Sequence, residues 1–467
     1  MTTIPALTVR SQVDVSSGKV PLSVRRLCDL TYLERSIHRM LCGWGNQFQG
    51  WDDKVAVCRH VWDQACIVER LRNRITQFPG VQADEPVSVE LERLVNTVLC
   101  APSFEDALDG IYQVLNTSIV NAYLDFIGEV SGIHDAPTHQ IIREIVTIKD
   151  LHRRWRSEYR MRVNHTPDAV YMQRINEQLQ AVGNLSSSVK VDPQHTADPV
   201  GVNTDFRPLK HRVDPTWKTY GDRDLLDWIA VDFAQSIESR QLFWAVGYMR
   251  ELGLAMEQLL WLYDSHDLPW AFGLDESRHM WDESRHGDSG YARLKELGID
   301  IGEVGFAHVR GLQRDDANHN VSQPTEPMSP TALYDVLFFI CMVAETGHFR
   351  VKREAFADFR EGGDMASAEM MLYDIIDETM HVQYGHQWLE TLARRAGIEH
   401  EGYEKRASGL RQQKQIDADA RADILRKMPD RQACPVYQNY QQLLSHLRER
   451  CPLSNARTCP PRSSKPM

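Results

Sequence analysis

The sequence predicts an all-helical protein made of two helical bundles. Strand patterns are nearly absent, and long stretches carry apolar residues every three to four positions, which is the helical period. Proline and glycine interrupt these stretches at intervals typical of helix boundaries. At 467 residues the chain is also longer than one core usually supports, so we expect two domains.

Changes in composition along the chain predict where these domains lie. A first helical bundle is expected over residues 20–182. Residues 183–221 carry Ser, Pro, Asp and Gly without periodicity and are interpreted as a linker. A second bundle is expected over 222–425, followed by a flexible tail over 426–467 that is rich in Pro, Arg and Ser.

Within the second block the apolar periodicity predicts four long helices. The first is expected over 225–252, with a short helical piece over 256–263. The others are expected over 268–297, 331–359 and 366–396. Pro330 precedes the third, and Gly298 and Gly397 follow the second and fourth, in agreement with the residue preferences at helix ends. Four long helices of this kind favour a four-helix bundle.

Composition argues against several classes of protein. The net charge of −12 argues against a nucleic-acid partner, which would need a basic face. No apolar run reaches the roughly 20 residues of a membrane-spanning helix, and the N-terminus lacks a signal-peptide pattern. We therefore expect a soluble, cytoplasmic protein with no membrane contact. The nine cysteines are scattered and are expected to be mostly small core residues.

Two Glu-x-x-His motifs carry the strongest chemical signal. Glu283 and His286 lie in the second expected helix, and Glu378 and His381 in the fourth. At this spacing the two side chains of each motif share one helix face. A bundle core can hold two metal ions with two such motifs and a single Glu from each remaining helix. A lone motif of this kind is usually a solvated face, so the prediction depends on the complete set.

Two further glutamates complete the set. Glu345 follows a run of apolar residues in the third helix, where a buried carboxylate is costly unless it is paired or ligated. Glu238 lies in the middle of the first expected helix. The predicted metal ligands are therefore Glu238, Glu283, His286, Glu345, Glu378 and His381.

The second helix contains a duplicated Glu-Ser-Arg-His, which leaves an alternative open. Seven residues correspond to about 700°, so Glu276 and His279 share nearly one face with Glu283 and His286. Either pair could supply ligands. His279 could also be an additional ligand or support one, and His348 and His386 are candidates for the same supporting role.

These residues resemble the ferritin-like superfamily, most closely a family of uncharacterised ferritin-like proteins. The resemblance rests on Asp282-Glu283-Ser284-Arg285-His286, on the segment from Arg293 to Gly298, and on Asp377, Glu378, His381, Val382, Gly385 and Trp388. The run His279-x-x-x-Glu283-x-x-His286 is similar to a pattern of the di-iron arylamine N-oxygenases, although there it lies in the last helix. The resemblance implies a ferritin-like bundle with two iron ions, or an iron–manganese pair.

The first block shows a faint internal repeat of the second. His60 precedes Arg70-Leu71-Arg72 by the spacing that separates Glu283 from Arg293-Leu294-Lys295. Where a Glu-x-x-His would fall, however, the chain has His60-Val61-Trp62-Asp63. We therefore interpret the first bundle as a degenerate, metal-free repeat.

The expected function is that of a di-iron, oxygen-dependent oxidoreductase. Its substrate would be a small molecule that undergoes hydroxylation, N-oxygenation or oxidative cleavage with O2. No flavin or nicotinamide fingerprint is evident, so an external electron donor is a candidate partner. The alternatives are a non-catalytic metal-storage protein, a tRNA-modifying hydroxylase and a purely structural bundle. The oligomeric state stays open, with a homodimer as one option.

Overall fold

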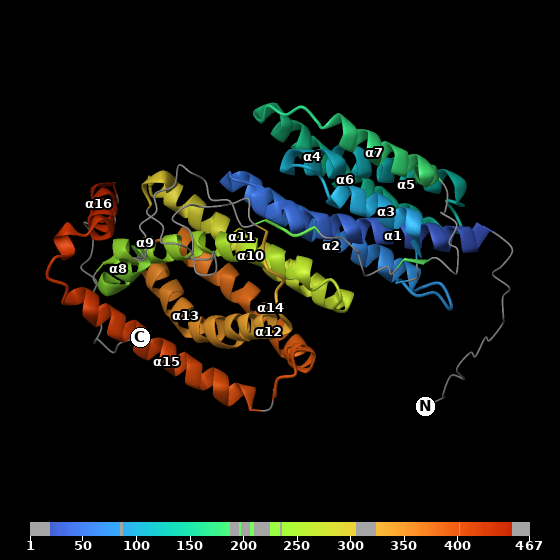
Figure 1. Cartoon of the computed structure of the whole chain (residues 1–467). Helices are drawn as coiled ribbons and strands as arrows, with labels where there is room; N and C mark the ends of the chain where they lie inside the picture. Colours follow the sequence, from blue (N-terminus) through green and yellow to red (C-terminus); the bar gives the residue numbers. More distant parts are fainter. Residues whose placement is uncertain are drawn as a thin grey trace. The chain divides into compact units, whose positions relative to one another are not determined.

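The structure is a computed structural model and describes residues 19–84, 87–186, 196–197, 206–209, 225–233, 236–304, 324–400 and 402–450. These residues are almost entirely helical (Figure 1). The prediction of an all-helical protein is therefore confirmed for the part of the chain that is described.

The chain forms two compact units. The first consists of residues 1–38 and 66–206, and the second of residues 39–65 and 207–467. The helices α1 (Lys19–Trp44) and α2 (Trp51–Ile75) therefore each contribute to both units. Residues 39–65 thus belong to the second unit, whereas the expected boundary lay in the linker. Most of that linker, 183–221, lies outside the described residues.

The first unit is a set of helices with one short strand pair. Its further elements are α3 (Val89–Leu99), α4 (Phe104–Leu108), the π-helical segment η2 (Asp109–Leu115), α5 (Asn116–Glu129), α6 (Ala136–Arg162), α7 (Ala169–Ala181) and η3 (Gly183–Leu185). Strands β1 (Val87–Ser88) and β2 (Thr196–Ala197) pair in antiparallel register. Ser88 and Ser103 each cap the following helix, because their hydroxyls accept a backbone N–H three residues on.

The second unit contains four long helical rods. The first is α9 (Ile237–Met249) with α10 (Glu251–Asp264), the second is α11 (Trp270–Glu296), the third is α12 (Pro330–Leu337), η5 (Phe338–Glu345) and α13 (Thr346–Glu361), and the fourth is α14 (Met365–Ala396). Helix α11 packs against α9, α10 and α14, while α14 also packs against α12, η5 and α13. The rods therefore form a helical bundle. The remaining elements are η1 (Gly45–Gln47), α8 (Leu225–Asp232), η4 (Ile301–Glu303), α15 (Tyr403–Arg426), η6 (Arg431–Ala433) and α16 (Pro435–Arg450).

The first rod differs from the helix expected over 225–252. Helix α8 ends at Asp232, and Ser236 begins α9 with extended backbone and a hydroxyl that accepts the N–H of Ser239. Arg250 keeps helical dihedral angles between α9 and α10, so the rod continues to Asp264. Its midpoint lies near residue 251. The other three rods begin and end within two residues of their expected bounds.

Two glycines allow unusually close packing in this bundle. A Cβ atom on Gly290 would lie 2.5 Å from the backbone nitrogen of Met249, and one on Gly385 would lie 2.6 Å from the Cβ atom of Cys341. Neither approach is possible for a larger residue without a shift of the neighbouring helix. Helix α11 is thereby held close to the first rod, and α14 close to η5.

The expected flexible tail over 426–467 needs correction. Helix α16 lies within it, with apolar side chains buried at helical spacing: Val436, Tyr440, Leu443, Leu444 and Leu447. The ring of Tyr437 lies 4.9 Å from that of Trp228 in α8. The prediction was wrong because it used the Pro, Arg and Ser content of the whole tail and not the helical periodicity of this segment. Residues 451–467 lie outside the described residues.

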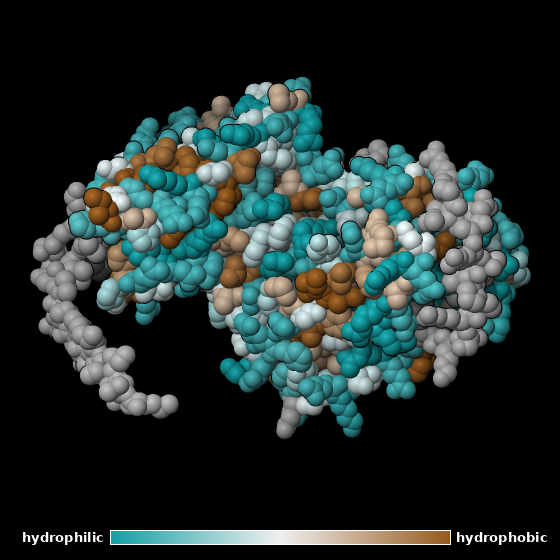
Figure 2. All heavy atoms as spheres, turned by 180° about the vertical axis from the view of Figure 1, so that it is seen from behind, coloured by the Kyte–Doolittle hydropathy of each residue, from teal (hydrophilic) through white to brown (hydrophobic). Residues whose placement is uncertain are grey.

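The third rod, Pro330–Glu361, is long and apolar enough to cross a membrane by length and composition, but half of its most apolar window is buried inside the protein. It is the only such helix among the described residues. Buried core helices share this composition. On the face shown in Figure 2, hydrophilic side chains predominate and apolar ones form small, separate patches.

Candidate metal centre

The four rods of the second unit bring carboxylates and imidazoles together in the buried interior of the bundle. Among the residues that the structure describes, two groups of side chains have ligand atoms close enough to share an ion, all within 4.8 Å of one another. The four-residue group consists of His279, Glu283, Glu345 and His381. The three-residue group consists of Glu251, Glu283 and His286. Glu283 belongs to both groups, so they form one centre with two adjacent positions.

The four-residue group has the spacing of a ligand set. His279 Nε2 lies 3.3 Å from Glu283 Oε1 and 3.2 Å from Glu345 Oε1. His381 Nδ1 lies 3.1 Å from the same Glu345 oxygen and 3.6 Å from Glu283 Oε1. Four ligands at about 2.1 Å around a tetrahedral ion lie about 3.4 Å apart. The observed separations therefore fit a metal ion at the centre of the group.

The three-residue group lies on the other side of Glu283. His286 Nδ1 is 3.2 Å from Glu251 Oε2, the carboxylate that begins α10. It is also 3.4 Å from Asp374 Oδ1 in α14. This second position therefore has one imidazole and three carboxylates nearby.

Several of these atoms are buried without a hydrogen bond. Within the described part of the chain, Glu345 Oε2 has no hydrogen-bond partner, while Glu251 Oε2 and both ring nitrogens of His279 have contacts of 3.2–3.6 Å that lack hydrogen-bond geometry. Buried polar atoms are normally hydrogen-bonded, because an unmet one costs about 1–3 kcal/mol. These nitrogen and oxygen atoms converge on one region, where a metal ion would be bound by them. The residues present therefore fit the metal ions that the sequence predicts.

His381 of the four-residue group and His286 of the three-residue group each contact an aspartate from the opposite helix. His381 Nε2 lies 3.3 Å from Asp282 Oδ2, and His286 Nε2 lies 3.2 Å from Asp377 Oδ2. Arg285 contacts both aspartates, with 2.7 Å to Asp377. Burial alone would raise the pKa of Asp282, but His381 and Arg285 hold it below its usual range. Such an aspartate fixes the imidazole so that the other nitrogen, Nδ1, faces the metal position.

The structure brings Glu283, His286, Glu345 and His381 together, but it does not bring Glu238 to them. Glu238 is buried in the first turn of α9. It lies thirteen residues before Glu251, which is roughly 20 Å along the helical rod. Sequence reasoning placed the middle of the first helix at Glu238 because it began that helix at 225. With the rod at 237–264, the same midpoint argument selects Glu251, which the sequence analysis missed.

Glu378 is near the centre but has a different partner. Its Oε1 oxygen forms a buried ion pair with Lys352, which pairs with Asp374 as well. Sequence reasoning did not identify Lys352 or Asp374. Glu378 therefore lies outside both groups as they stand, although its other oxygen, Oε2, has no hydrogen-bond partner among the described residues.

Of the four residues predicted as additional ligands or supporting groups, one belongs to a group, one lies beside it and two lie elsewhere. His279 joins the four-residue group. Glu276 lies beside it, with Oε2 3.6 Å from His279 Nδ1, and accepts a hydrogen bond from Gln258 at 3.2 Å. His348 contacts Lys414 and His386 contacts Tyr403, so neither belongs to a group.

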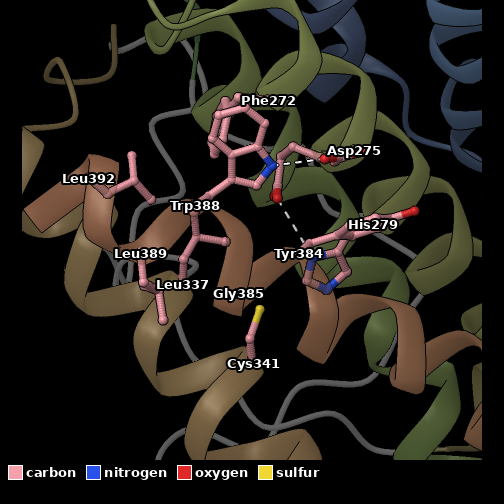
Figure 3. A pocket seen from close by; sticks show the side chains of 11 residues that line it. Phe272, Asp275, His279, Leu337, Cys341, Tyr384, Gly385, Trp388, Leu389 and Leu392 are labelled. Atoms are coloured by element: carbon pink, nitrogen blue, oxygen red, sulfur yellow. Dashed lines mark hydrogen bonds and ion pairs between the residues drawn. The ribbon is translucent and has the colours of Figure 1, made fainter. Parts of the chain in front are cut away.

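A pocket opens onto the His279 side of the centre (Figure 3). Its walls come from α11, α12, η5 and α14 and are mostly apolar: Phe272, Leu337, Cys341, Trp388, Leu389 and Leu392. The Trp388 indole donates to Asp275 at 2.8 Å and packs edge-on against Phe272. The space inside it is small and holds about one water-sized molecule, so a larger ligand requires its apolar walls to move apart.

Metal binding at this centre is expected to tighten as the pH rises. Burial alone would lower the pKa of His279, but Glu276 and the two carboxylates of its group raise it well above 6.5; Asp374 and its neighbours do the same for His286. The raised pKa values mean that each ring keeps its proton to a higher pH in the metal-free protein, so an ion must displace those protons. We expect the Kd for Mn²⁺ to fall roughly tenfold or more between pH 6 and pH 8. Calorimetry in buffers of different ionisation enthalpy measures the released protons, and a pH-independent Kd would contradict this protonation state.

Comparison of the chain with models of known protein families, with curated proteins and with solved structures finds no match.

Proposed function

We propose that the chain is a ferritin-like, non-haem di-iron oxidoreductase that uses O2 to oxidise a small molecule. One observation carries the proposal: Glu283 is common to two adjacent groups of imidazoles and carboxylates, supplied together by all four rods of one bundle. Bundles that hold a pair of redox metals do so with inward-facing Glu and Glu-x-x-His residues. Mixed imidazole and carboxylate ligands suit iron and also manganese, so an iron–manganese pair is the variant of the same proposal.

The surrounding residues support an oxidative role. Such a metal pair, when bound, supplies the electrons for reduction of O2. The chain itself orients the ligands through Asp282 and Asp377 and excludes water from the four-residue group, all of whose members are buried. The apolar pocket beside His279 leads toward the centre but holds only about one water-sized molecule, so binding of a compact substrate requires it to widen. The candidate reactions are hydroxylation, N-oxygenation and oxidative cleavage, with electrons supplied by an external donor.

The test is to load the protein with Fe²⁺ without oxygen, measure iron per chain, and then admit O2. We expect about two irons per chain at saturation and a transient absorption that depends on oxygen. Both should be lost or strongly reduced in Glu345→Ala, whereas Glu238→Gln should behave like the wild type. Iron binding that is indifferent to Glu345→Ala would refute the assigned centre. Steady accumulation of ferric mineral without substrate would instead indicate a storage protein.

A further inference from the structure

Lys352 is a buried cation at the edge of the metal centre. It is 1% exposed, and its ammonium pairs with two carboxylates one turn apart on α14, those of Asp374 and Glu378. Asp374 also accepts a hydrogen bond from the hydroxyl of Tyr248 at 2.6 Å. A buried lysine is costly unless it is well paired, so this cluster fixes a positive charge at one place in the bundle.

The Lys352 charge is linked more directly to the three-residue group than to the four-residue group. Asp374 Oδ1 lies 3.4 Å from His286 Nδ1, the imidazole nitrogen of the three-residue group. The carboxylate that Lys352 binds is therefore in contact with a candidate ligand of that group. Glu378, which the sequence predicted as a ligand, is bound by the same ammonium. The four-residue group, in contrast, has two imidazoles and two carboxylates that contact one another directly.

The first unit contains a similar arrangement. There Lys149 in α6 is fully buried and lies 2.6 Å from Glu34 and 2.8 Å from the Asn116 side-chain oxygen. Both units have a π-helical segment, η2 or η5, before the helix that precedes the long α6 or α14. None of the metal-capable groups found among the described residues lies in the first unit. A lysine thus provides the cationic charge for a buried carboxylate in that unit.

The geometry points to Lys352 as a built-in cation that replaces the charge of one metal ion. A divalent ion then binds first in the four-residue group. The three-residue group binds a second ion only when the pairs of Lys352 with Asp374 and Glu378 open, and at least tenfold more weakly, because the ammonium repels an ion nearby at low effective dielectric. This inference rests on the proposed function, since it requires that the centre bind metal at all.

The experiment is titration of the whole chain with Mn²⁺, followed by calorimetry and by electron paramagnetic resonance, which distinguishes single from coupled ions. The wild type should bind one Mn²⁺ tightly and a second at least tenfold more weakly. Lys352→Met should tighten the second step at least tenfold, while Lys352→Arg, which keeps the charge, should leave it weak. Lys414→Met is the matched control, because it removes a lysine that contacts His348 rather than the carboxylates of the centre.

The outcomes separate the two proposals. A wild type that binds two Mn²⁺ ions with equal affinity overturns the role of Lys352 but leaves the metal centre intact. A wild type that binds none refutes the proposed function itself. If Lys352→Met does not fold, Lys352→Met/Glu378→Gln removes the ammonium together with one of its carboxylates. A second step in that variant as weak as in the wild type would then also overturn the inference.

Discussion

Replacing Glu283 with glutamine is expected to abolish stoichiometric metal binding at both positions. The side chain contributes to the four-residue group and to the three-residue group, and its Oε1 oxygen lies within 3.6 Å of two histidines. Residues that only support a ligand usually cost 10–100-fold in metal affinity when they are replaced. Loss of a ligand common to two positions should therefore weaken binding of Fe²⁺ by more than ~100-fold. Anaerobic calorimetry and metal analysis after gel filtration measure this loss.

Two further Glu→Gln substitutions provide the controls for this result. Glu251→Gln should weaken only the second binding step, because Glu251 belongs to the three-residue group alone. Glu238→Gln should change neither step, since Glu238 lies outside both groups although it is buried in the same rod. Retention of tight binding in Glu283→Gln, or loss in Glu238→Gln, would show that the ligands are not those assigned here.

The sequence predicted the rods well because their ends have strong local signals. Gly397, for example, ends α14 with left-handed backbone at φ 67°, a conformation that glycine adopts without strain. The break before α9 has a weaker signal, because Ser236 lies between apolar stretches that share one helical period. That single missed boundary moved the expected midpoint of the first rod and put Glu238 where the structure has Glu251.

Contacts between side chains that are far apart in the sequence could not be predicted from local motifs. Nothing in the motif Asp377-Glu378-Thr379-Met380-His381 indicates that Glu378 pairs with a lysine 26 residues earlier, while the Asp before it supports His286. The duplicated Glu-Ser-Arg-His was ambiguous because both copies share one face. In the structure both copies contribute to the candidate centre: His279 belongs to the four-residue group, His286 to the three-residue group, and Glu283 to both.

The second large effect is expected in the first unit, where Lys149→Met should strongly destabilise the protein. The variant takes the ammonium away from Glu34, which is fully buried and also accepts a hydrogen bond from the Tyr123 hydroxyl at 3.0 Å. Removing one member of a buried ion pair typically costs about 3–5 kcal/mol. Denaturant unfolding followed by circular dichroism measures the free energy, and hydrogen exchange of α1 and α6 attributes the change to this unit.

A second substitution shows whether charge is the cause. Lys149→Met/Glu34→Gln removes both charges of this pair, and a glutamine oxygen can still accept from Tyr123, so most of the lost stability should return. The matched surface control is Arg70→Met, which breaks a half-exposed pair with Glu144 and should cost less than about 1 kcal/mol. Equal losses in the single and double variants would mean that the packing of Lys149, rather than its charge, stabilises the unit. Recovery would instead establish that the first unit balances a buried carboxylate with a lysine, the arrangement that we infer for one side of the metal centre.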